Sequence, residues 1–247
     1  GAPAAAGGEP PPPAARPARR PRAPPRAPPG PTVIAQQADA FRRFAGGRLR
    51  LDVGAHGAGL THDQRYGRTD EVMAVVRDLL DGRRIDFQGE HVQVEGAQLS
   101  DPAVEHPVPL YFGGESPAAD GIAARRADVR LVRSAPPAVV AERVARSRDR
   151  NPRLRYGLRL RLVGRAEESE ARDAADRIVD DGRSGPAGDT VVGTYDEVAR
   201  RLFAYRQLGI DEFVLYGCTG PGEPARVAGE VLPRLRALTD AAAVCGA

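Results

Sequence analysis

The stretch VPLYFGGESPAA, residues 108–119, indicates how this chain folds. Its first half is a short apolar run without alternation, which is typical of a strand buried on both faces of a parallel sheet. Gly113 and Gly114 then let the chain turn sharply without a Cβ clash, and a helical stretch follows over about residues 117–126. The stretch therefore predicts a strand, a tight turn and a helix in immediate succession.

The same succession of strand and helix recurs along the chain. Predicted strands that suit a parallel sheet are residues 48–53, 108–112, 128–132, 156–165 and 211–217, and a further short strand is predicted at 190–193. Predicted helices are residues 32–47, 69–82, 117–126, 136–149, 167–182, 194–209 and 224–238, with Thr69 and Thr194 as caps. Residues 84–96 alternate around Gly89 and predict a hairpin. The pattern predicts βαβ units and an α/β fold, but five strands make only part of an eight-stranded (β/α)8 barrel.

Composition and charge separate a tail from the globular part, which we place at residues 31–238. Residues 1–30 hold 11 of the 23 prolines, with five arginines and one acid, so they carry +4 while the other 217 residues carry −1 of the net +3. Such a segment cannot bury enough apolar area to fold, so we expect a disordered tail with polyproline II character. The alternative is a basic interaction arm, but no aromatic residues separate its arginines, and nucleic-acid binding is not expected. Residues 239–247 predict a short C-terminal tail.

The remaining composition indicates the compartment. No run of 18 or more apolar residues exists, so no membrane-spanning helix is expected, and the N-terminus lacks the apolar segment of a secretory signal. The only cysteines, Cys218 and Cys245, form neither a disulfide framework nor a metal-site spacing. We therefore expect a cytoplasmic protein.

Candidate site residues lie where the predicted parallel strands end, because ligands of such folds bind at the carboxyl ends of the strands. These ends are Gly54, Gly113, Arg133, Arg165 and Gly217. At the turn formed by Gly113 and Gly114, the free amides of the next helix suit a phosphate. The alternative is a tight turn that binds nothing, and the neighbouring Glu115 counts against an anion.

Polar and aromatic side chains near these ends offer further candidates, each with a plainer alternative. His62, Arg65 and Tyr66 precede the helix predicted at 69–82 and could contact a phosphate and a ring system, or form a surface loop. Arg159 and Arg161 share one face of a strand, which suits an anionic substrate or cofactor, or else a solvated sheet edge.

Two single residues carry weaker signals. His56 follows a strand and could act as a base, although a lone loop histidine usually has no such role. Cys218 lies at the end of the last predicted strand, where a small buried residue is the plainer interpretation.

Eight stretches distributed along the chain carry a resemblance to a known family, in whose members they occur in the same order. They are PTVIAQQADAFRRFAGGRLRLDV, HDQRYGRTDEVM, DFQGEHVQVEGAQL, PVPLYFGGESPAA, APPAVVAER, YGLRLRLVGR, LGIDEFVLYG and PARVAGEVLPRL. Together they resemble the later part of bacterial luciferase-like, flavin-dependent monooxygenases, closest to the alkanesulfonate monooxygenase branch, over about five-sixths of the chain. The resemblance implies a TIM-barrel fold, here a partial barrel lacking the first three strands.

The resemblance also implies how the protein works. It implies reduced FMN delivered by a separate flavin reductase, activation of oxygen on the flavin, a small-molecule substrate, and assembly into dimers or tetramers. The family's phosphate site matches Tyr66 and the turn at Gly113, Gly114 and Ser116, and we include the adjacent His62 and Glu115 in the cofactor site. Arg159 and Arg161 are the catalytic candidates. A deazaflavin is the alternative cofactor.

Several positions depart from the family pattern. Arg161 stands where the family has a histidine, Cys218 where it has a tyrosine, and Asp52 where it has an asparagine. The Thr-Gly-Gly that follows this asparagine has become Ala55-His56-Gly57, and the long loop after Gly182 is shortened. The scaffold signature therefore survives while several chemical groups are replaced.

Three functions follow from these observations. The first is a flavin-dependent monooxygenase that acts on a small organic substrate, with organosulfur compounds as candidates. The second is a catalytically impaired remnant or partner subunit, whose open sheet edges would associate with another chain. The third is an interaction protein that works through its basic tail. We choose the first as the family's activity and expect no turnover of an alkanesulfonate by this chain.

Overall fold

The computed structural model describes residues 29–57, 59–180, 190–216 and 222–245. Almost all of the predicted N-terminal tail, as well as Gly217 and Cys218, lies outside the described residues. Within them, no helix is long and apolar enough to cross a membrane.

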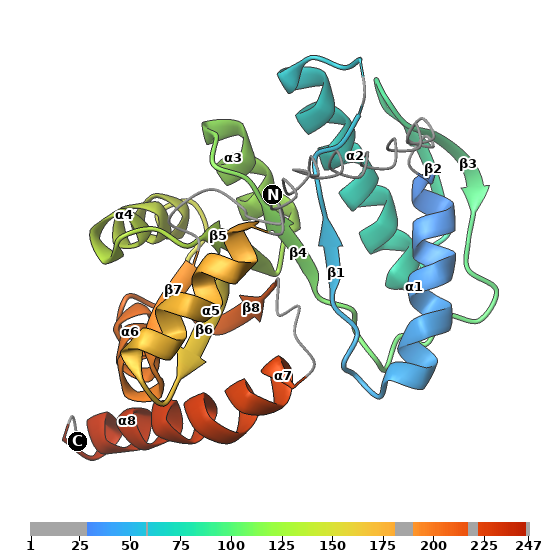
Figure 1. Cartoon of the computed structure of the whole chain (residues 1–247). Coiled ribbons are helices and arrows are strands. Elements are labelled where there is room, and N and C mark those ends of the chain that lie inside the picture. The colour runs from blue at the N-terminus through green and yellow to red at the C-terminus, as the bar shows by residue number, and fades with distance from the viewer. Residues whose placement is uncertain (1–28, 58, 181–189, 217–221, 246–247) are drawn as a thin grey trace, which may run out of the picture.

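A curved parallel sheet is the centre of the molecule (Figure 1). Its strands are β1 (Leu51–Val53), β4 (Leu110–Gly113), β5 (Val129–Arg133), β6 (Arg155–Arg165), β7 (Thr190–Thr194) and β8 (Glu212–Leu215). The order is β1-β4-β5-β6, and the long strand β6 pairs with β8 along its first half and with β7 along its second. In the described part of the chain, β1 pairs only with β4 and β8 only with β6. The sheet is therefore open, which confirms the predicted α/β fold and partial barrel.

Helices connect the strands and cover the outer face of the sheet (Figure 1). They are α1 (Pro31–Ala45), α2 (His62–Leu80), α3 (Pro117–Arg126), α4 (Pro137–Arg148), α5 (Glu168–Asp180), α6 (Tyr195–Gln207), and the continuous run of α7 (Glu223–Arg226), a π-helical turn η1 (Val227–Val231) and α8 (Leu232–Cys245). The last helix thus continues through most of the predicted C-terminal tail.

The two faces of the sheet differ in what they bury. Alternate residues of the strands, such as Leu110 and Phe112, join the main core beneath the helices. The residues between them point to the concave inner face, where Tyr111, Val129 and Leu131 form a small separate cluster. This alternation gives the inner face room for polar side chains at the strand ends.

Helix α2 begins earlier than the sequence predicted. Thr61, not Thr69, is its cap: the Thr61 hydroxyl accepts the Gln64 amide, and the Gln64 side chain accepts the Thr61 amide. Thr69 is buried inside the helix, where its hydroxyl donates to the Arg65 carbonyl at 2.7 Å. The prediction was wrong because this capping box, T-x-x-Q, was overlooked. His62, Arg65 and Tyr66 therefore lie on the first two turns of a helix instead of in a loop.

A hairpin of β2 (Ile85–Gln88) and β3 (Gln93–Ala97) packs beside α2 and is fastened to it by one carboxylate. The side chain of Glu71 accepts the amides of Glu90, His91 and Val92 at 2.8–2.9 Å. The three amides belong to the turn of the hairpin, so a single side chain of α2 sets the shape of that turn.

Replacing Glu71 by alanine should therefore destabilise the protein. We expect Glu71→Ala to lower the free energy of unfolding by about 2–3 kcal/mol, because three amides lose a charged acceptor and water replaces it only in part. Urea unfolding measures this, and Glu95→Ala, on an exposed position of the same hairpin, is the control and should change little. Equal losses in the two variants would contradict the role of Glu71.

Candidate functional site

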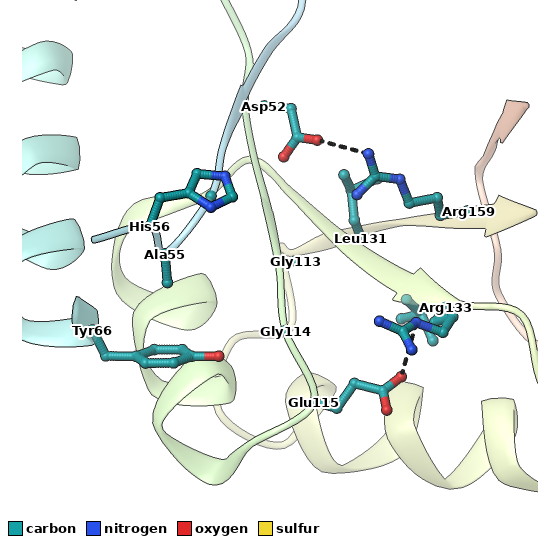
Figure 2. A pocket seen from close by; sticks show the side chains of 12 residues that line it. Asp52, Ala55, His56, Tyr66, Gly113, Gly114, Glu115, Leu131, Arg133 and Arg159 are labelled. Carbon is teal, nitrogen blue, oxygen red and sulfur yellow. Dashed lines mark ion pairs between the residues drawn. The ribbon is translucent and has the colours of Figure 1, made fainter. Parts of the chain in front are cut away.

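A cavity of about 360 Å³ opens on the concave face, at the carboxyl ends of β1, β4 and β5 and beside the middle of β6 (Figure 2). It is lined by Asp52, Gly54, Ala55, His56, Tyr66, Gly113, Gly114, Glu115, Leu131, Val132, Arg133 and Arg159. Its size falls within the range of small-molecule sites. The sequence placed ligand binding at this end of the strands, and the cavity lies there.

The turn after β4 shapes one wall of the cavity, and Gly114 is the position that must be glycine. A Cβ atom there would lie 2.7 Å from the Ala119 Cβ and 2.8 Å from the Tyr66 hydroxyl oxygen. At Gly113 a Cβ would meet Leu131 at 3.4 Å, which is an ordinary contact. The missing Cβ of Gly114 thus lets the Tyr66 hydroxyl approach the backbone of the turn, as Figure 2 shows.

Helix α3 begins directly behind this turn. The Ser116 hydroxyl accepts the Ala119 amide at 3.2 Å and caps the helix, so Ser116 supports the turn without lining the cavity. Asp120, one turn further, is buried. The position of the helix start brings its amino-terminal end next to the cavity wall.

A buried arginine contacts the turn from the helix side of the sheet. Arg130 of β5 is 3% exposed, and its Nη2 donates to the Gly114 carbonyl and to Asp120, both at 2.6 Å. Ser147 completes the cluster, because its hydroxyl donates to Asp120 and faces Arg130 Nε at 3.4 Å. Burial lowers the pKa of the Arg130 guanidinium, and the charge of Asp120 opposes that shift. The carbonyl of Gly114 is therefore drawn toward the helix side of the sheet.

Tyr66 forms the opposite side of this wall. Its ring stacks on His62, with centroids 4.4 Å apart, and meets Phe112 edge-on at 6.2 Å. His62 does not line the cavity, so its contact with the site is through Tyr66. Both residues are there because α2 starts at His62 and places them one turn apart.

The charged side chains of the cavity are matched with opposite charges. Arg159 Nη2 lies 3.6 Å from the Asp52 carboxylate. Glu115 lies 2.9 Å from Arg143 of α4 and 4.0 Å from Arg133. The sequence counted Glu115 against anion binding, but these arginines offset its charge. The sequence did not indicate Arg133 and Arg143 as partners of Glu115, because β5 and α4 approach the turn only in the folded chain.

Arg159 and Arg161 share the inner face of β6 but have different surroundings. Both guanidinium groups lie over the ring of Tyr216, at 6.0 Å for Arg159 and 5.5 Å for Arg161. Arg159 is half exposed and lines the cavity, whereas Arg161 is buried and does not. Of these two arginines, only Arg159 reaches a ligand in the cavity.

A tyrosine–glutamate pair lies deeper on the same face. Tyr111 donates its hydroxyl to Glu212, which also accepts from Arg155 at 2.9 Å. Burial and the Glu212 carboxylate raise the pKa of the Tyr111 hydroxyl, so it stays protonated at neutral pH. Neither residue lines the cavity, and the pair joins β4 to β8 across the inner face.

Among the remaining candidates, His56 lines the cavity, exposed, with its ring folded back over Gly54. Within the described ranges, no three His, Cys, Asp or Glu side chains are grouped closely enough to hold a metal ion. The cavity therefore unites the predicted cofactor-binding residues Tyr66, Gly113, Gly114 and Glu115 with the candidates Arg159 and His56, whereas His62, Ser116 and Arg161 lie outside its lining.

Comparison with known proteins gives consistent results. The family model described as luciferase-like monooxygenase matches residues 26–185, which is more than half of the chain. The structure is similar to the EDTA monooxygenase of Chelativorans sp. BNC1, with a TM-score of 0.70 and 17% identity over 84% of this chain and 70% of that one.

Two further solved structures share the fold. A riboflavin lyase, crystallised with modified FMN and riboflavin, has a TM-score of 0.71 and 17% identity over 85% of this chain and 68% of that one. The coenzyme F420 dependent tetrahydromethanopterin reductase of Methanopyrus kandleri has a TM-score of 0.66 and 16% identity over 83% and 79% of the two chains.

Proposed function

The chain belongs to the luciferase-like monooxygenase family, and we propose that it uses a reduced flavin, FMN, and molecular oxygen to oxygenate a small organic substrate. The bound flavin supplies two electrons, so that one oxygen atom enters the substrate and the other leaves as water with two protons. A separate flavin reductase would supply the reduced flavin. The residues of this chain bind, orient and shield the reactants.

The observation that supports this proposal is the cradle at Gly114. A phosphate needs backbone amides, a hydroxyl donor and space without a side chain, and the glycine turn, the Tyr66 hydroxyl and the missing Cβ provide these together. Arg130 holds the Gly114 carbonyl toward the helices, away from an anion at the turn. The residues present therefore fit the phosphate end of a flavin.

The remaining residues have supporting or substrate-facing roles in this proposal. His62 packs behind Tyr66 and Ser116 caps α3, so both position the phosphate site. Arg159 faces the substrate, and Leu131 gives the cavity an apolar side chain that limits water. Arg161 lies over the ring of Tyr216 and helps to orient it.

Titration of the full chain with FMN, oxidised and reduced, under anaerobic conditions tests the proposal. Flavin fluorescence or calorimetry monitors the binding. We expect saturable micromolar binding of reduced FMN and weaker binding of riboflavin, which lacks the phosphate. A deazaflavin is titrated in parallel because the fold is shared with a reductase that depends on coenzyme F420. Absence of FMN binding would overturn the proposal, and binding of the deazaflavin alone would favour the alternative of a deazaflavin-dependent oxidoreductase.

A further inference from the structure

One ion pair decides the electrostatic character of the cavity. Asp52 and Arg159 belong to β1 and β6, which are separated in the sheet by β4 and β5. In a flat sheet these two strands would be about 14 Å apart. The curvature brings the Asp52 carboxylate to 3.6 Å from the Arg159 guanidinium, directly across the concave face (Figure 2).

The pair does not serve mainly to stabilise the fold. The side chain of Arg159 is 51% exposed and that of Asp52 is 44% exposed. Exposed pairs of this kind contribute little to stability, since solvent screens them and side-chain entropy opposes them. Their effect on a ligand is different, because an anion that approaches Arg159 must sit beside the Asp52 carboxylate or displace it.

The other charged groups do not remove this effect. Glu115 faces Arg133 and Arg143 on the opposite wall, so the cavity lining contains two arginines and two carboxylates. Arg161 carries a further charge on the same strand, but it is buried and lies outside the lining. Arg159 is thus the cation best placed to meet a substrate, and its charge is already offset.

We infer that Asp52 determines substrate specificity, by offsetting the charge of Arg159 so that the cavity takes an uncharged organic molecule and disfavours sulfonates and carboxylates. The inference rests on the proposed function, which identifies this cavity as the place where the substrate binds. The apolar side chain of Leu131, which lines the cavity from the inner face, suits the hydrocarbon part of such a molecule.

The experiment compares a matched anion and alcohol in the absence of flavin. Hexanesulfonate and 1-hexanol are titrated into the full chain by calorimetry or NMR, for the natural protein and for Asp52→Asn. We expect Asp52→Asn to bind hexanesulfonate about three- to tenfold more tightly, with hexanol affinity unchanged, since one nearby negative charge is removed. Adding Arg159→Gln to Asp52→Asn should abolish the gain.

A matched control separates this local effect from a change in overall charge. Asp101→Asn removes a carboxylate that lies 3.3 Å from Arg43 outside the cavity, and it should leave both affinities unchanged. The inference is overturned if Asp52→Asn gains no sulfonate affinity, or if it gains as much affinity for hexanol as for hexanesulfonate. Because flavin is omitted, a protein that fails to bind FMN would refute the proposed function without deciding this comparison.

Discussion

Replacement of Arg130 by methionine is expected to lower the free energy of unfolding by about 3–5 kcal/mol, because it leaves the buried Asp120 carboxylate without its closest cation. Arg130 and Asp120 are 3% and 2% exposed, so water cannot replace the lost contact. The Gly114 carbonyl loses its donor as well, and Arg146, 3.6 Å from Asp120, is half exposed and compensates only in part.

Urea unfolding of three variants separates this mechanism from a general loss of packing. Arg130→Met/Asp120→Asn should recover about 1–2 kcal/mol relative to Arg130→Met, since the unpaired charge is gone while Ser147 keeps an acceptor. Arg172→Met removes an exposed arginine that pairs with Glu168, and it should shift stability by no more than about 0.5 kcal/mol. If the free energy of unfolding of Arg130→Met lay within about 1 kcal/mol of the natural protein's, Arg130 would not stabilise the Asp120 carboxylate and the Gly114 turn as described.

The second large effect is expected at Gly114, where alanine should weaken FMN binding by at least about tenfold, equivalent to about 1.4 kcal/mol. The added methyl group would lie 2.7 Å from the Ala119 Cβ and 2.8 Å from the Tyr66 hydroxyl. Either the start of α3 or the Tyr66 ring must move, and both form the proposed phosphate site. Anaerobic FMN titration measures the change.

Gly113→Ala is the matched control, one residue earlier in the same turn. Its methyl group would make only an ordinary contact with Leu131, at 3.4 Å, so FMN affinity should fall much less. Riboflavin provides a second comparison, because a defect confined to the phosphate end should affect FMN more than riboflavin. Equal FMN affinities for the natural protein and Gly114→Ala would contradict the assignment of the turn.

Sequence patterns alone predicted most of the fold. The uniform apolar run before Gly113 indicated a strand covered on both faces, and β4 is such a strand. Helices such as α4 and α6 followed from local chemistry, namely proline at the first turn or a threonine cap. The late start assigned to α2 was an error of the same local kind, since the capping box at Thr61 was readable.

The candidate site was predictable in its location but not in its contacts. Gly54, Gly113 and Gly114 could be placed near one another, since parallel strands end at one edge of a sheet and ligands bind there. Arg159 lies in the middle of β6, and its pairing with Arg133 at the end of β5 brings it to the same level. Tyr66 was a candidate from its place in the chain, but only the family resemblance matched it to the turn at Gly113 and Gly114, because nothing local places a residue of α2 beside that turn. The sequence did not predict the role of Arg130. Alternation along the strand indicates which face of the sheet Arg130 occupies, but it does not identify Asp120 and the Gly114 carbonyl as its partners.

By itself, the sequence determined the order and type of the elements, the parallel sheet and the edge where ligands bind, because these depend on hydrophobic period, caps and turns within a few residues. Tertiary structure alone decided which charges meet. Asp52 reaches Arg159 across two intervening strands, and Arg130 reaches the Gly114 carbonyl. Glu115, just before α3, meets Arg143 of α4. Such pairings depend on the curvature of the sheet and the approach of helices, which no local pattern encodes.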